Sequence, residues 1–264
     1  MTALGGRGSK WTSTADVYFD SEDIVGIWRA KNPTKAKDIF LASEFAITLH
    51  EHGSQTVDTS SEYARVALER SLKRLQTGII KSKTVEAMAQ FKKEGTIRFF
   101  GLSEVSAGTL RRAHAVHPIT TVQVEYSPFT LDIEDPRVAL LGTWRELGVA
   151  VVVYSPVGRG LLTGRYATRE SITKDFFLNV AKKKGVAPIQ ATLAWLLARE
   201  PFVVPIPGTR SIKDLEENTA SAQLQLTDEE NKRITEAANA TKLLGAGYPA
   251  GFPDNYGFGT TPEL

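Results

Sequence analysis

Three short apolar runs decide the fold of this chain: IRFFGL (97–102), TTVQV (120–124) and GVAVVV (148–153). Each is too short for a helix, is rich in β-branched or aromatic residues, and is bounded by turn-forming residues, which predicts buried strands. Helical patterns separate them, over residues 106–116 and 136–147, and the second opens on a proline and ends before a glycine. Alternating strands and helices are typical of a parallel sheet that helices cover on both faces.

Polar residues and glycines follow each of these runs. Ser103 and Glu104 follow the first run, the second contains Gln123 and continues into Glu125, and the third continues into YSPVGRG (154–160). In parallel α/β folds and barrels, ligands bind at the carboxyl ends of the strands. The sequence therefore predicts a binding site at this end of the sheet.

Composition excludes several classes of protein. The chain has 264 residues, 42% of them hydrophobic and 23% charged, which suits a globular α/β domain. The net charge of +2 is too small to predict a nucleic-acid or membrane partner. The absence of cysteine excludes a disulfide framework, a thiol nucleophile and a cysteine-based metal site.

The sequence also predicts where the protein resides. No run of about 18 apolar residues could span a bilayer, and the first ten residues lack the apolar core of a secretion signal. We expect a soluble, cytoplasmic protein. His114 and His117 could share a helix face, but no carboxylate lies beside them at ligand spacing, so we predict no metal site.

Capping signals mark the starts of three further helices. Thr59 and Glu62 form a capping box ahead of a helix that runs to Leu75. Ser211 is the predicted cap of a helix through residue 218, and residues 227–230 (TDEE) form a second capping box for a helix to about residue 240.

The motifs GLSEV (101–105), VQVEYSP (122–128) and VYSPVGRGLLTG (153–164) resemble the aldo-keto reductases in order and in spacing. The similarity is greatest to the microbial and fungal, pyridoxal-reductase-like branch. It implies an α/β fold, a (β/α)8 TIM barrel, over residues 12–244, with a disordered N-terminus (1–11) and a C-terminal tail (245–264). It also implies an NADP(H)-dependent oxidoreductase that reduces a small-molecule aldehyde or ketone to an alcohol, by analogy in fungal secondary metabolism.

The barrel that this resemblance implies is incomplete, since only six of the eight strands of an intact barrel can be found. The missing ones correspond to the first and fourth strands of the family. We expect unpaired sheet edges, and with them low stability, self-association or a rearranged closure. The six strands that remain lie near Thr12, Phe40, Phe100, Val122, Val151 and Val203.

The catalytic positions of the family are only partly retained. By the resemblance, Tyr18 falls on the catalytic tyrosine that gives a proton to the substrate carbonyl. Ser13 stands where the family has aspartate, and Glu44 stands where it has a lysine that lowers the pKa of the tyrosine; a carboxylate there should raise that pKa. The segment with the catalytic histidine is missing, and neither His50 nor His52 replaces it by alignment.

The cofactor side is better retained, and the resemblance implies NADPH as the cofactor. The implied contacts are Ser103 and Gln123 to the nicotinamide carboxamide, Tyr154 to its ring, Ser155, Val157, Gly158 and Gly160 to the pyrophosphate, Gly208, Thr209 and Arg210 to the 2′-phosphate, and Glu217 and Asn218 to the adenine.

A second interpretation is a protein without catalytic activity. Strong family motifs flank the missing segments on both sides. This pattern is the one expected if coding segments had been lost, rather than if the sequence had drifted gradually. The chain could then be a catalytically dead remnant that binds NADP or a partner protein, or the product of an incomplete gene model. Tyr18 would in that case be an ordinary surface or core tyrosine. The sequence predicts neither the substrate nor the oligomeric state.

Overall fold

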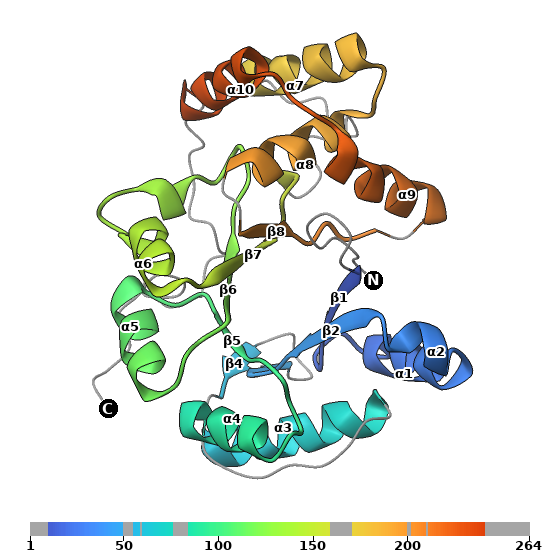
Figure 1. Ribbon diagram of the computed structural model, residues 1–264, viewed down its shortest axis with the longest axis vertical. Helices are drawn as coiled ribbons and strands as arrows, with labels where there is room; N and C mark the ends of the chain where they lie inside the picture. Colours follow the sequence, from blue (N-terminus) through green and yellow to red (C-terminus); the bar gives the residue numbers. More distant parts are fainter. Residues whose placement is uncertain are drawn as a thin grey trace. The chain divides into compact units, whose positions relative to one another are not determined.

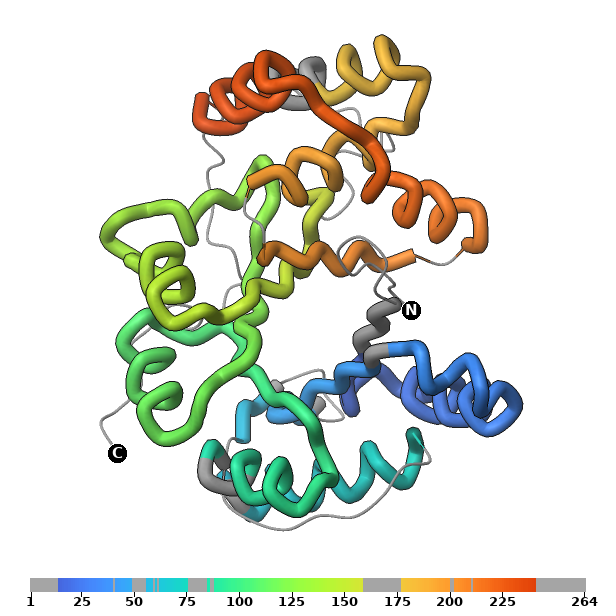
Figure 2. The backbone as a smooth tube through the Cα atoms, viewed as in Figure 1, coloured from blue at the N-terminus to red at the C-terminus, as the bar shows by residue number. Residues whose placement is uncertain are grey.

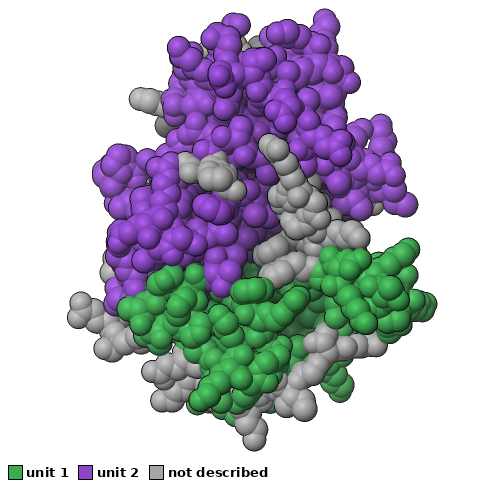
Figure 3. All heavy atoms as spheres, viewed as in Figure 1, with its two compact units in different colours: residues 1, 9–100, 113–119 green, residues 2–8, 101–112, 120–264 purple. Residues whose placement is uncertain are grey.

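A computed structural model describes residues 10–49, 55–58, 60–75, 84–158, 171–199, 202–209 and 211–240 (Figures 1 and 2). The chain divides into two compact units, which Figure 3 distinguishes by colour. Among the described residues, unit 1 comprises those within 10–100 and 113–119, and unit 2 comprises those within 101–112 and 120–240.

Unit 1 contains one parallel strand pair and one antiparallel hairpin. Strands β1 and β2 are parallel, and their register places Ala15 opposite Glu44. Strands β3 and β4 form the hairpin, which the sequence did not predict. The elements of unit 1 are β1 (Lys10–Ala15), α1 (Ser21–Lys31), α2 (Pro33–Ala36), β2 (Ile39–Glu44), β3 (Ile47–Leu49), β4 (Gln55–Val57), α3 (Ser61–Arg74) and α4 (Thr84–Lys93).

Helix α1 packs closely against the end of α3. A side chain at Gly26 would place its Cβ only 2.0 Å from the carbonyl oxygen of Arg74, so the backbones of the two helices can approach only because residue 26 has no side chain. Helices α3 and α4 share an apolar cluster built around the buried Leu72 and Phe91.

Unit 2 contains a four-stranded sheet in the order β5-β6-β7-β8, in which every neighbouring pair is parallel. Its central strands are buried, with Val122, Val124, Val151 and Val153 at most 1% exposed. The elements are β5 (Gly101–Ser103), α5 (Ala107–Val116), β6 (Thr121–Glu125), η1 (Asp132–Glu134), α6 (Leu140–Leu147), β7 (Ala150–Tyr154), α7 (Ser171–Lys184), α8 (Pro188–Arg199), β8 (Val203–Pro205), α9 (Ile212–Ala220), η3 (Ser221–Gln223) and α10 (Asp228–Ala240). Helix α5 begins in unit 2, and its residues from 113 onward belong to unit 1.

The predicted parallel strands are confirmed. The described residues contain six strands in parallel sheets, two in unit 1 and four in unit 2, at the six places that the sequence indicates. The positions at which the family's first and fourth strands would fall, before residue 10 and within residues 76–83, lie outside the described residues. The predicted disordered N-terminus and C-terminal tail also lie largely outside them, although β1 already begins at Lys10.

Two predicted starts of helices are confirmed by side-chain hydrogen bonds. The Ser211 hydroxyl accepts a hydrogen bond from the backbone N–H of Asp214 at 3.0 Å. Thr227 and Glu230 bond reciprocally, because the Glu230 carboxylate accepts from the Thr227 N–H at 2.9 Å and the Thr227 hydroxyl accepts from the Glu230 N–H at 3.2 Å.

Three predicted boundaries are wrong. The cap of α3 is Ser60 rather than Thr59, since the Ser60 hydroxyl accepts from the Tyr63 N–H at 3.2 Å. The strand predicted over 97–102 is β5, which begins only at Gly101, because the Thr96 and Ile97 N–H groups bond to the Phe91 carbonyl and close the end of α4. The helix predicted over 136–147 is α6, which begins at residue 140 because Ala139 takes a left-handed φ of 53°.

Among the described helices, none combines the length and apolar character needed to cross a membrane.

Candidate active site

In unit 2 the register of the sheet gathers the predicted nicotinamide contacts. Ser103 is the last residue of β5 and lies directly opposite Gln123 of β6. Beyond this pair, the N–H of Glu104 donates to the Gln123 carbonyl at 2.9 Å, and the Glu104 carboxylate accepts from the Glu125 N–H at 3.1 Å. The carboxyl ends of β5 and β6 are therefore joined one residue past the ladder, which fixes Ser103 and Gln123 side by side.

The loop after β7 has an unusual backbone. Tyr154 ends β7 opposite Glu125 and is partly buried. Ser155 and Gly158 both have a positive φ, 49° and 58°, and the Gly158 N–H donates to the Ser155 carbonyl at 3.0 Å. Pro156 has no N–H and the Gly158 N–H bonds within the turn, so the N–H groups of Ser155 and Val157 are the ones in this turn that could meet a phosphate group.

An aromatic ring supports this turn. A Cβ atom at Gly158 would lie 2.5 Å from Cδ2 of Phe129, so glycine is required there both for its φ and for the space beside the ring. Val157 is partly buried within the turn, whereas Gly160 lies outside the described residues.

The segment after β8 leads into helix α9. Gly208 and Thr209 precede the Ser211 cap, and a side chain at Gly208 would meet no atom within 4 Å. Glu217 lies 3.8 Å from Lys213 in an ion pair along the helix. Arg210 lies outside the described residues.

Asn218 in α9 is the polar residue of this region that most clearly needs a partner. It is only 2% exposed, and neither its amide nitrogen nor its amide oxygen has a hydrogen-bond partner within the described structure. Unpaired buried amides are costly, so Asn218 is the side chain in this region that most needs a further hydrogen-bond partner.

Tyr18 lies in unit 1, in the turn between β1 and α1. Its N–H donates to the Ala15 carbonyl at 3.1 Å, and its own carbonyl accepts from the Ser21 N–H at 2.9 Å. Its side chain is 59% exposed. Partial burial of the phenol, followed by the negative charge of Glu44, raises the pKa of Tyr18, which agrees with the expectation for a carboxylate at position 44.

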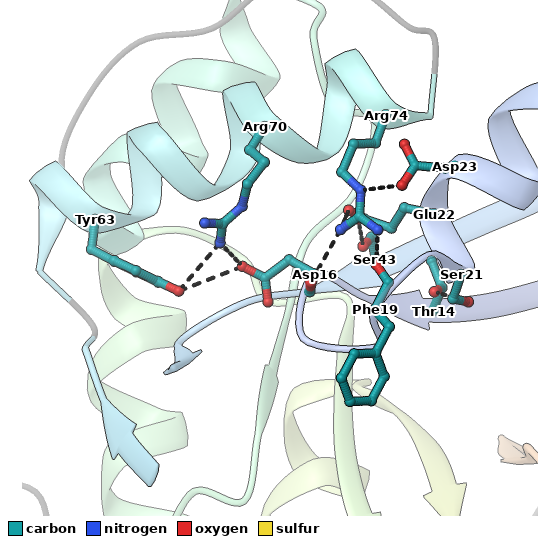
Figure 4. Close-up of polar contacts among 10 residues, drawn as sticks. All are labelled: Thr14, Asp16, Phe19, Ser21, Glu22, Asp23, Ser43, Tyr63, Arg70 and Arg74. Atoms are coloured by element: carbon teal, nitrogen blue, oxygen red, sulfur yellow. Dashed lines mark hydrogen bonds and ion pairs between the residues drawn. The ribbon is translucent and has the colours of Figure 1, made fainter. Parts of the chain in front are cut away.

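The turn that carries Tyr18 is held by Arg74 at the end of α3, as Figure 4 shows. The Arg74 guanidinium donates to the carbonyl of Asp16 at 3.2 Å and to the carbonyl of Phe19. It also pairs with the fully buried Glu22 at 3.2 Å and with Asp23 at 2.9 Å. One side chain therefore fixes the two sides of the turn and the start of α1.

A second guanidinium holds the buried side chain of Asp16. Arg70 contacts Oδ2 of Asp16 at 2.5 Å, and the Tyr63 hydroxyl lies 3.5 Å from the same oxygen. Sequence reasoning missed both arginines, because each reaches a residue more than fifty positions away.

Within the described part of the chain, no three side chains of the metal-ligating types come together. The His114 Nδ1 accepts from the Ile119 N–H at 3.3 Å, and the His117 ring packs against Phe100 with centroids 5.0 Å apart.

Comparison with known proteins supplies the decisive observation. The profile of the aldo/keto reductase family matches residues 1–239. Aldo-keto reductase str7 of Strobilurus tenacellus is 40% identical, over 93% of this chain and 82% of that protein. The chain belongs to the aldo/keto reductase family.

Other members of the family agree with this assignment. Aldo-keto reductase yakc [NADP(+)] of Schizosaccharomyces pombe is 34% identical, over 95% of this chain and 85% of its own length. The crystal structure of an aldo-keto reductase from Klebsiella pneumoniae in complex with NADPH is 26% identical and matches with a TM-score of 0.69, over 88% of this chain and 81% of that one. The fold class is therefore that of the (β/α)8 barrels, and the described residues supply six of its parallel strands.

The alignments also reveal internal gaps. The alignment with the Strobilurus reductase extends over 280 residues, more than the 264 residues of the whole chain. Gaps must therefore lie opposite segments that the reductase possesses.

Proposed function

We propose that this chain is an NADPH-dependent carbonyl reductase that converts an aldehyde or ketone to an alcohol, with Tyr18 as the proton donor. The observation that carries the proposal is the order of residues along one end of the unit 2 sheet. Ser103, Gln123 and Tyr154 stand on three adjacent strands, and the turn at Ser155 follows the third. Membership of the aldo/keto reductase family supports the binding of a nicotinamide cofactor.

The residues present fit the cofactor. The buried amide of Asn218, unpaired on both its nitrogen and its oxygen, matches an adenine edge, which offers one acceptor and one donor side by side. The Ser155–Gly158 turn would bind the pyrophosphate through backbone N–H groups, and, by the resemblance to the family, Thr209 and Arg210 would bind the 2′-phosphate. Gly208 leaves room beside them, and Glu217 would join Asn218 at the adenine.

When bound, NADPH supplies the hydride. Ser103 and Gln123 would orient the carboxamide, and Tyr154 would lie against the ring. The proton comes from the Tyr18 hydroxyl. A raised pKa keeps this phenol protonated at neutral pH but also makes it a weaker acid than an unperturbed tyrosine, so proton donation should be slow in this chain.

The test begins with cofactor binding. Quenching of tryptophan fluorescence on titration with NADPH measures the affinity, and micromolar binding would support the proposal. Aldehyde-dependent oxidation of NADPH is then compared between the wild type and Tyr18→Phe, which removes only the hydroxyl. A loss of about 100-fold or more in kcat with unchanged NADPH affinity is the expected result. Equal activity in both proteins would refute the role of Tyr18.

A second candidate is a catalytically dead NADP-binding protein, favoured by Glu44 and Ser13 at positions where the family has lysine and aspartate. It predicts NADPH binding without aldehyde reduction. Sequencing the transcript addresses the third alternative, an incomplete gene model, since a restored strand segment after residue 77 would supply the missing histidine. A cytoplasmic location and a place in fungal secondary metabolism stay predictions of the resemblance.

A further inference from the structure

Phe19, the residue after Tyr18, combines two unfavourable features. Its φ is +44°, in the left-handed region that costs a residue with a side chain about 1 kcal/mol or more. Its aromatic side chain is also 84% exposed, the largest exposure among the exposed large hydrophobic residues of the described chain. An exposed ring on a strained backbone gains little from packing within its own unit, so its position needs another explanation.

The strain at Phe19 is imposed by its surroundings. Arg74 donates to the Phe19 carbonyl and to the Asp16 carbonyl, and it is itself held by the carboxylates of Glu22 and Asp23 (Figure 4). The Ile24 N–H donates to the Asp20 carbonyl at 3.0 Å, so α1 begins directly after the turn. The conformation of Phe19 is therefore fixed in advance of any ligand.

The place of the turn gives this ring a use. The turn follows the carboxyl end of β1, the end of a parallel strand at which barrel enzymes bind their substrates. Phe19 is joined directly to Tyr18, whose hydroxyl must reach the substrate carbonyl in the proposed reaction. A rigid aromatic ring at such a place binds apolar and aromatic groups by stacking or edge contact.

We propose that Phe19 is a specificity-determining residue that lies against the substrate beside the Tyr18 hydroxyl, and that the substrate is a carbonyl compound with an aromatic body. This inference rests on the proposed reductase function. The carbonyl group of the substrate would lie toward Tyr18 and its aromatic ring toward Phe19. A short aliphatic aldehyde has no such ring, so it would contact Tyr18 but not Phe19.

Two variants and one control test the inference. Phe19→Ala removes the ring, and Phe19→Gly removes both the ring and the backbone strain. Phe202→Ala is the matched control, because Phe202 is also strongly exposed, at 65%, but precedes the amino end of β8. The kinetic probes are benzaldehyde and propanal, each with NADPH. Ligand-observed NMR with benzyl alcohol and 1-propanol gives a readout that needs no turnover.

We expect both Phe19 variants to raise the KM for benzaldehyde by about three- to tenfold, the worth of one aromatic contact, and to leave propanal unchanged. The NMR contact to benzyl alcohol should weaken likewise, while the control retains it. Phe19→Gly should also melt at the same temperature as the wild type or higher, because it relieves the left-handed strain.

Three results would overturn the inference. The wild type could show no contact with benzyl alcohol, or the Phe19 variants could retain that contact. A clearly lower melting temperature of Phe19→Gly would also overturn it, because it would mean that the ring packs against protein. A chain that reduces neither aldehyde, yet loses the benzyl alcohol contact only in the Phe19 variants, would refute the reductase function and retain Phe19 as an aromatic-binding residue.

Discussion

Replacement of Arg74 by methionine should be the most damaging single change in unit 1. Arg74 is the cation that pairs with Glu22, a carboxylate without solvent exposure, at 3.2 Å. Removing one partner of a buried ion pair typically costs about 3–5 kcal/mol, because the other charge stays buried without compensation. The half-exposed pair with Asp23 adds about 0–1 kcal/mol, and each lost bond to the turn carbonyls about 0.5–1.5 kcal/mol. These losses are not additive, and we expect a total of about 4 kcal/mol.

The assay is hydrogen exchange of peptides from β1 and α1, measured by mass spectrometry, together with urea unfolding. Arg74→Met should accelerate exchange in both elements. Arg111→Met is the control, since Arg111 and Glu146 form an exposed pair in unit 2 whose loss should leave exchange in β1 and α1 unchanged. Adding Glu22→Gln to Arg74→Met removes the buried charge and should restore about half of the lost stability.

A destabilisation below about 1 kcal/mol would refute this reasoning, since it would mean that Glu22 needs no cation. A double variant as unstable as Arg74→Met alone would equally refute it, by attributing the loss to packing rather than to charge.

Three further predictions follow from the site and its surroundings. Glu44→Lys removes the negative charge that helps to raise the pKa of Tyr18. The pH at which alcohol oxidation begins should therefore fall, and the rate of oxidation at neutral pH should rise by at least about tenfold. The measurement is NADP⁺ reduction across a pH series. Gly158→Ala should weaken NADPH binding by about tenfold in a fluorescence titration, because its Cβ would collide with Phe129 at 2.5 Å and its φ is 58°, whereas Gly142→Ala, with no atom within 4 Å of the new Cβ, should leave binding unchanged. Burial works against ionisation of Glu230, but the Thr227 N–H and the ammonium groups of Lys184 and Lys183 outweigh it and lower its pKa to about 2. A lowered pKa in the folded state means stability that is present above about pH 4.5 and lost as the pH falls toward 2, so acid unfolding of unit 2 should be shallower in Glu230→Gln, which keeps the capping side chain.

The sequence predicted those parts of the structure that depend on local pattern. The strand at residues 150–154 is a continuous apolar run, and the helix at 212–220 begins after a capping serine, so both were readable from neighbouring residues. The hairpin of β3 and β4 carries little alternation over its short strands and escaped prediction. The role of Arg74 was out of reach as well, because its bond to Asp16 spans 58 positions and no local pattern encodes such a pairing.

The candidate site divides in the same way. Ser103, Gln123 and Tyr154 lie in or at the ends of predicted strands. Because the strands are parallel, these residues come together at one end of the sheet, as the observed register shows. The left-handed conformations of Ser155 and Phe19 do not follow from residue type, since neither is a glycine or an asparagine. The conformation of Phe19 depends on Arg74, which is 55 positions away, whereas the Ser155 carbonyl is bonded within its own turn by the Gly158 N–H.

The closeness of α1 to α3 has a consequence for how this protein can change over evolutionary time. With only 2.0 Å between a hypothetical Cβ at position 26 and the Arg74 carbonyl, even alanine would force the two backbones apart. In a library of all substitutions, position 26 should accept glycine alone, while its helix neighbours Ile24 and Ile27, both at least half exposed, should accept many residues. Every missense change at the codon for Gly26 should therefore be harmful, although the exposed positions of the same helix should tolerate substitution.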